Sequence, residues 1–270
     1  MLLIVDIMEG RALIDSAFVE AIEAGDLKKA RDLIGRGADP NVRNEFGQGV
    51  LHDAALRGDI TVVTFMVEMK ADPRIADDKL RTPLHQAAMG GLIPRQKAAR
   101  VDRLQVAEFL MENGADPDAR DSTGRIPLHD AFGFINEPLV ELLVRSTTHI
   151  DALDNRGFTP LHEAARNGRI HAVALLVGNG VPVNAKSDLG ITPLHLAASE
   201  GHIPTIHFLI NKGADPLNTD NSGMTAARVA WSLEYDEAAV RLEKYERAAM
   251  IRKVERIMGI EQPKGKRRVK

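Results

Sequence analysis

The sequence predicts an all-α solenoid of about seven repeats, each made of two helices, a turn between them and a projecting loop. The tetrapeptide Thr-Pro-Leu-His stands at residues 82–85, 159–162 and 192–195, with Ile in its first place at 126–129 and degraded copies at 49–52 and 225–228. Successive copies start 33 residues apart, except for one step of 44 residues. A fixed period of this length is typical of stacked repeats, in which each unit is too small to bury its apolar face alone.

Residues 159–191 show one unit most clearly. Thr159 suits the N-cap of a first helix, with its hydroxyl placed to accept an amide N–H, and Pro160 suits the first helical position. We expect this helix over residues 160–167 and its end at Gly168, because glycine tolerates the left-handed backbone of a helix stop. The second helix ends near residue 180 and carries apolar residues at helical spacing, namely Ile170, Val173, Leu176 and Val177. A polar loop then leads into the next copy.

Overlaying the copies extends this pattern to both ends of the chain. The glycine that ends the first helix recurs as Gly25, Gly58, Gly91, Gly168 and Gly201. A first copy, which lacks the tetrapeptide, carries Lys29 and Asp32 at otherwise apolar positions, and the last copy carries Asp236, Arg241 and Glu243. Polar outer faces are typical of terminal caps. We therefore predict an N-terminal extension over residues 1–15 and a repeat domain over 16–258, with repeats starting near 16, 49, 82, 126, 159, 192 and 225.

These residues together resemble the ankyrin repeat. The resemblance is carried by Thr-Pro-Leu-His-x-Ala-Ala, by the glycine after the first helix, and by Gly-Ala-Asp-Pro at residues 37–40, 114–117 and 213–216. It covers residues 16–257. It implies paired antiparallel helices, β-hairpin-like loops that project sideways, and a concave surface made of loop tips and first helices. It also implies that the chain works by holding another protein. We expect the chain to act as an adaptor, inhibitor or regulatory subunit that binds its partner along the concave face.

The composition narrows the function classes. Thirty-five Lys and Arg stand against 38 Asp and Glu, so the chain as a whole offers no strongly basic field and a duplex nucleic-acid binder is disfavoured. No apolar run approaches the roughly 20 residues that cross a bilayer, so we expect no membrane partner. We expect a cytoplasmic location, with a nuclear or secreted-effector location left open. The chain has no cysteine, which excludes disulfides and thiolate chemistry.

Five histidines share one repeat position: His52, His85, His129, His162 and His195. Stacked helices lie about 10 Å apart, which is too far for successive copies to share a metal ion. We therefore expect a structural hydrogen bond from helix to loop in each unit. No H-E-x-x-H, G-x-S-x-G or G-x-x-x-x-G-K-[ST] pattern is present. The sequence thus predicts no enzyme, catalytic residue, metal, cofactor or small-molecule substrate.

The projecting positions predict a groove for a protein or peptide with apolar anchors and acidic groups. They mix apolar with basic residues, a composition that is enriched in protein interfaces. Apolar turn residues that pack on the next loop are the alternative for part of this set. The candidate partner-binding residues are Phe46, Arg57, Arg81, Met89, Arg125, Phe132, Leu153, Arg156, Phe158, Arg166, Lys186, Leu189, Ile191 and Met224.

Two stretches of the chain depart from the repeat. The step of 44 residues places an 11-residue insertion at 92–102, between the helices of the third copy, with Arg95, Lys97 and Arg100 as possible loop contacts. It is either a tolerated surface loop or a contact for a partner. The fourth copy lacks both helix-stop glycines, having Ile135 and Thr147 instead. A left-handed turn kept at either position would cost about 1 kcal/mol.

Two further features remain open. Phe132 and Phe134 in the fourth copy either fill its core or face outward as anchors. Residues 259–270 hold five positive charges among the last seven and predict a disordered basic tail. This tail either aids solubility or supports an alternative function, that of a nuclear or nucleic-acid-associated regulator.

Overall fold

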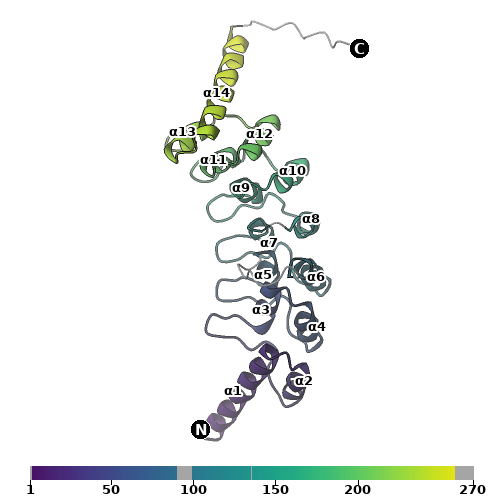
Figure 1. Ribbon diagram of the computed structural model, residues 1–270. Coiled ribbons are helices and arrows are strands. Elements are labelled where there is room, and N and C mark those ends of the chain that lie inside the picture. The colour runs from purple at the N-terminus through teal and green to yellow at the C-terminus, as the bar shows by residue number, and fades with distance from the viewer. Residues whose placement is uncertain (1, 90–98, 135, 259–270) are drawn as a thin grey trace, which may run out of the picture. The chain divides into compact units, whose positions relative to one another are not determined.

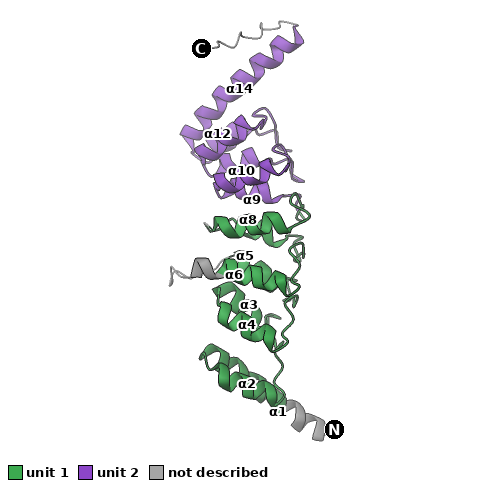
Figure 2. Cartoon of the chain, turned by 90° about the vertical axis from the view of Figure 1, so that its right-hand side faces the viewer, with its two compact units in different colours: residues 1–155 green, residues 156–270 purple. Residues whose placement is uncertain are grey.

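The computed structural model describes residues 2–89, 99–134 and 136–258, and all of its regular elements are helices. The chain divides into two compact units, residues 1–155 and 156–270, which are coloured separately in Figure 2. The predicted fold class, an all-α repeat solenoid, is confirmed.

Within unit 1, helices pair in sequence and the pairs stack. Helices α3, α5 and α7 pack on one another in succession, and α4, α6 and α8 form a second layer beside them, on the right in Figure 1. Buried leucines join the two layers, among them Leu51, Leu84, Leu110 and Leu143. The helices of this unit are α1 (Leu2–Glu23), α2 (Leu27–Gly35), α3 (Val50–Arg57), α4 (Ile60–Glu68), α5 (Pro83–Met89), α6 (Ala99–Glu112), α7 (Pro127–Asp130) and α8 (Glu137–Ser146).

Unit 2 repeats the arrangement. Helices α9, α11 and α13 pack in one layer, and α10, α12 and α14 in the other. Its core is also made of leucines, including Leu161, Leu176, Leu194 and Leu209. The helices are α9 (Pro160–Arg166), α10 (Ile170–Gly178), α11 (Pro193–Ser199), α12 (Ile203–Asn211), α13 (Ala226–Ser232) and α14 (Asp236–Ile257).

Helix-stop glycines hold the left-handed backbone that the sequence predicted. Gly25, Gly58, Gly168 and Gly201 all have positive φ between 64° and 73°. The fourth copy solves the same problem differently at Thr147, whose backbone is extended with φ -75°. The strain expected there is therefore absent. Asp118 holds the segment instead, since its carboxylate accepts hydrogen bonds from the Thr147 hydroxyl and from the amide of Thr148, the latter at 3.0 Å.

The structure differs from the expected boundaries at the first repeat and at the insertion. Helix α1 runs without a break across residue 15, where the extension was expected to give way to the first repeat. Helix α6 begins at Ala99, so the last residues of the expected insertion, Arg100 among them, belong to a longer second helix. Arg95, Lys97, Ile135 and the basic tail at 259–270 lie outside the described residues.

Candidate protein-interaction surface

The shared histidine ties the first helix to the loop of the following repeat at His52, His85, His162 and His195. In the clearest copy, the backbone N–H of Thr159 donates to Nδ1 of His162 at 3.0 Å, and Nε2 of the same ring lies 3.0 Å from the carbonyl oxygen of Ile191. Because Nδ1 accepts, the proton is on Nε2, and the neutral imidazole satisfies both groups. The imidazole thus accepts the amide N–H of the N-cap residue Thr159 itself, as the side chain of the N3 residue does in a capping box.

The same tie recurs along both units, which confirms the structural interpretation of the histidines. His52, His85 and His195 reach the carbonyl oxygens of Arg81, Arg125 and Met224, respectively, at 2.9, 3.1 and 3.0 Å. Burial lowers the pKa of all three rings, although the bond to each carbonyl partly opposes it. These rings are therefore neutral at pH 7, as the tie requires.

A second set of bonds closes each loop on itself. In the loop before α5, the amide of Asp77 donates to the carbonyl of Arg81 at 2.9 Å, and the Asp77 carboxylate accepts from the amides of Lys79 and Arg81 at 2.9 Å each. Asn44, Asp121 and Asp220 hold their loops with the same pattern of side-chain bonds. Asp and Asn are favoured in such turns because their side chains bond the backbone two residues on.

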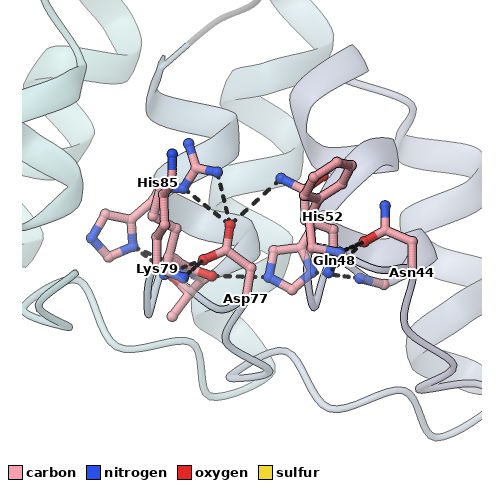
Figure 3. A network of polar contacts seen from close by, with 10 residues as sticks. Asn44, Gln48, His52, Asp77, Lys79 and His85 are labelled. Atoms are coloured by element: carbon pink, nitrogen blue, oxygen red, sulfur yellow. Dashed lines mark hydrogen bonds and ion pairs between the residues drawn. The ribbon is translucent and has the colours of Figure 1, made fainter. Parts of the chain in front are cut away.

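Asp77 is the most deeply buried of these carboxylates, and Figure 3 shows the polar contacts around it. It accepts two bonds from the guanidinium of Arg81, at 2.8 and 3.0 Å, and lies 3.5 Å from the amide of Gln48 in the preceding loop. Burial alone raises the pKa of Asp77, but the amide and guanidinium of Arg81 outweigh it and hold the pKa below its usual value. The Arg81 side chain thus stabilises its own loop by binding Asp77.

Neighbouring loops are joined tip to tip by backbone hydrogen bonds. In unit 1 the amides of Asp78, Ser122 and Asn155 donate to the preceding loops, and in unit 2 those of Asp188 and Asn221 do so, at 2.8–3.3 Å. The loops approach so closely that a Cβ added to the tip glycine Gly157 would lie 2.8 Å from the backbone nitrogen of Asp188. Side chains beside the tips therefore stand on a backbone that is fixed from both sides.

This frame presents exposed apolar side chains. Phe46 and Leu153 in unit 1, and Leu189 in unit 2, are 62%, 53% and 63% exposed. Leu80, which is 54% exposed, belongs to the same set but was missed, because it occupies the place that glycine has in the other loops. Lys186 is exposed three residues before Leu189, Arg156 is exposed in the preceding loop, and Arg57 is exposed on α3.

Two candidates are corrected by the structure. Phe132 is 1% exposed and fills the core of the fourth copy, so it is not available as an anchor. Phe158 is 4% exposed, with its ring edge against His162 and the guanidinium groups of Arg156 and Arg166 at 5.0 and 5.5 Å from its centroid. Phe158 therefore orients two arginines and offers little surface to a partner itself.

Most of the remaining basic candidates are engaged within the chain. Arg125 bonds Asp130 at 2.9 Å, and burial raises the pKa of that carboxyl even though Arg125 opposes it. Arg166 lies 3.5 Å from Glu163, and Arg57 lies 2.7 Å from Asp53. The apolar candidates Met89, Ile191 and Met224 are half-buried. For these residues, contact with a partner stays a prediction.

Among the described residues, no group of three or more His, Asp or Glu side chains is arranged to hold a metal ion. None of the helices in the described ranges is both long enough and apolar enough to span a bilayer.

Comparison with known proteins identifies the family. The family model for ankyrin repeats matches residues 18–94, 96–187 and 172–246, which together cover most of the chain and reach into both units. No curated protein matches the chain. Ankyrin repeats are protein–protein interaction modules. The chain belongs to the ankyrin-repeat family.

Proposed function

We propose that this protein is a non-enzymatic adaptor, inhibitor or regulatory subunit that holds a protein or peptide partner through side chains beside its loop tips. The supporting observation is the pairing of exposed apolar side chains with a hydrogen-bonded loop backbone. An anchor that is already fixed loses little conformational entropy on binding, so more of its burial energy contributes to affinity. A cytoplasmic location forms part of this proposal.

Leu189 in unit 2 is the best single anchor. Its carbonyl oxygen accepts from the amide of Asn221 at 2.9 Å, and the loop is closed by the bond from the Ser187 amide to the Ile191 carbonyl, also at 2.9 Å. Arg156 and Lys186 supply exposed positive charge on the neighbouring loop and on the same loop. This composition favours a partner segment with an apolar side chain beside a carboxylate.

The test compares two exposed aliphatic side chains of the same unit. Leu189→Ala removes the loop-tip anchor, whereas Ile170→Ala removes a 42% exposed side chain at the start of the second helix α10. The partner is first purified on the wild-type chain, and its Kd for each variant is then measured by calorimetry. We expect Leu189→Ala to weaken binding by about 1–3 kcal/mol, the range of an interface hot spot, and Ile170→Ala to leave it unchanged.

The outcomes separate the loop tips from the second helices. Phe46→Ala makes the same test in unit 1, where the exposed ring follows the bonds that Asn44 makes to its loop. If Ile170→Ala weakens binding while both loop-tip variants bind normally, the partner uses the second helices and the proposal is wrong.

A further inference from the structure

The last repeat exposes far more apolar surface than a terminal cap needs. Of the fifteen large apolar side chains exposed in the described residues, nine lie between Trp231 and Met258. The polar residues expected of a cap are present, since Asp236 is exposed and Arg241 and Glu243 are half-exposed. These polar side chains do not cover the nine exposed apolar side chains, so the outer face of the last repeat is only partly polar.

The C-terminal half of α14 carries the densest part of this apolar surface. Met250, Ile251, Val254, Ile257 and Met258 are each between 45% and 76% exposed, and their spacing places them along one side of the helix. At 100° per residue they occupy an arc of roughly 120°. We call these five residues the apolar stripe. Exposed Arg252, Lys253 and Arg256 lie outside this arc.

The apolar stripe does not continue the face by which α14 packs in unit 2. That packing face consists of the buried residues Ala238, Ala239 and Leu242. The helical period places its centre roughly 120° around the axis from the centre of the stripe. Figures 1 and 2 show the helix running on past α12 and α13. The stripe therefore lies apart from the contact that α14 makes with α12 and α13.

Charge is segregated in the same region. Residues 247–270 hold nine Lys and Arg and two Glu, a formal charge of +7. Because the whole chain has a charge of -3, the preceding 246 residues carry -10. The exposed apolar stripe thus lies on the one strongly basic segment of an acidic chain.

We propose that the C-terminal half of α14 binds an anionic lipid surface, with the apolar stripe at the boundary of headgroups and acyl chains and the basic residues on the polar side of the helix, at the level of the lipid phosphates and carboxylates. A helix with an apolar arc and a basic polar face lies in the plane of such an interface. A polybasic segment that follows it in sequence adds attraction to anionic lipid, which is how paired weak signals anchor a protein.

Other occupants fit these observations less well. A nucleic acid would attract the charge, but residues 247–270 contain no aromatic side chain to stack on bases, and aliphatic side chains gain nothing from a phosphate backbone. A second copy docked stripe to stripe would bring two segments of +7 together. The proposal also revises the expectation of no membrane partner, which rested on the lack of a membrane-spanning run. An interfacial helix needs no such run.

The experiment is sedimentation of the full chain with vesicles of phosphatidylcholine alone or with about one third phosphatidylserine. We expect binding only to the serine-containing vesicles, weakened by salt. Ile251→Ser with Val254→Ser should reduce the partition coefficient about tenfold or more, because two apolar side chains no longer enter the lipid. Leu233→Ser, at an exposed site outside α14, is the matched control and should bind as the wild type does.

Charge reversal at Arg252, Lys253 and Arg256 should abolish vesicle binding without unfolding the chain, since all three side chains are exposed. Equal binding by the wild type and the stripe variant would overturn the proposal, because charge alone would then explain it. Absence of vesicle binding also overturns it. If vesicles are not bound, salt-sensitive binding to RNA would assign the basic end to nucleic acid. A dimer in light scattering that the stripe variant abolishes would assign the stripe to a second copy.

Discussion

Replacing the loop-tip glycine Gly157 with alanine tests whether loop-to-loop contact holds the repeats together. Gly157 has φ 75°, so any side chain there is strained by about 1 kcal/mol. An added Cβ would also lie 2.8 Å from both the backbone nitrogen and Oδ1 of Asp188, and 3.1 Å from the Cα of Ser187. Ordinary contacts of a Cβ begin near 3.4 Å, so the next loop must retreat by several tenths of an ångström.

That movement would disturb a backbone hydrogen bond between the two neighbouring loops. The amide of Asp188 donates to the carbonyl oxygen of Arg156 at 3.0 Å, one residue before the substituted position. Overpacking of this kind costs about 1–3 kcal/mol. Added to the backbone strain, it predicts that Gly157→Ala lowers the free energy of unfolding by about 2–4 kcal/mol.

Gly180 provides the matched control in the same unit. Its φ is 93°, also left-handed, but a Cβ added there would meet nothing within 4 Å. Gly180→Ala should therefore cost only the backbone strain, about 1 kcal/mol. Urea unfolding followed by circular dichroism gives both values. Equal losses for the two variants would refute the argument, because backbone strain alone would then explain them.

Three further predictions follow from backbone strain, from burial and from hydrogen bonding. Lys70 has φ 70° at the position that Gly37 occupies in the preceding repeat, and its side chain is exposed. Because glycine adopts this backbone without strain, Lys70→Gly should raise the melting temperature. A lower melting temperature would mean that the strain is absent. The pKa of His195 is lower in the folded state because the ring is buried. The contribution of His195 to the free energy of unfolding is therefore complete above about pH 6.5 and is lost as the pH falls below that value. The wild type should therefore be less stable at about pH 5.5 than at about pH 7.5, and the drop should be smaller in His195→Ala; equal drops would contradict this. A second loss should follow below about pH 4, since hydrogen bonds from Thr147 and Thr148 outweigh burial and hold the pKa of Asp118 at about 2.

The helices and the histidine ties could be predicted from the sequence because the same local rules act in every repeat. Thr159 and His162 recur with the same neighbours, so one interpretation of the motif serves all copies. The burial of Phe158 could not be predicted in this way, because Arg81, Arg125 and Ile191 occupy the same place in other repeats. Two arginines flank the ring of Phe158, Arg156 from the loop before it and Arg166 from the end of α9.

Leu80 and Thr147 show a second reason why the structure could not be predicted fully from the sequence. Both stand where other repeats have glycine, and residue type alone gives no way to tell how each is accommodated. The loop imposes φ 58° on Leu80 and leaves its side chain exposed. Thr147 escapes a left-handed backbone because Asp118, about one repeat earlier, offers a carboxylate to the end of α8. The position of the candidate surface at the loops could therefore be predicted from the sequence. Which residues are exposed on it depends on contacts between repeats and could not.

The histidine ties have a consequence for how such a chain changes in length. The ties from His52, His162 and His195 each span 29 residues, whereas the tie from His85 spans 40, and the bond is made in every case. The extra eleven residues lie wholly inside that span, so the two ends of the bond still meet. Loss or duplication of one whole repeat within a unit would likewise return each histidine to an equivalent carbonyl. The chain can thus lengthen or shorten by recombination in steps of one repeat while every remaining junction keeps its partner.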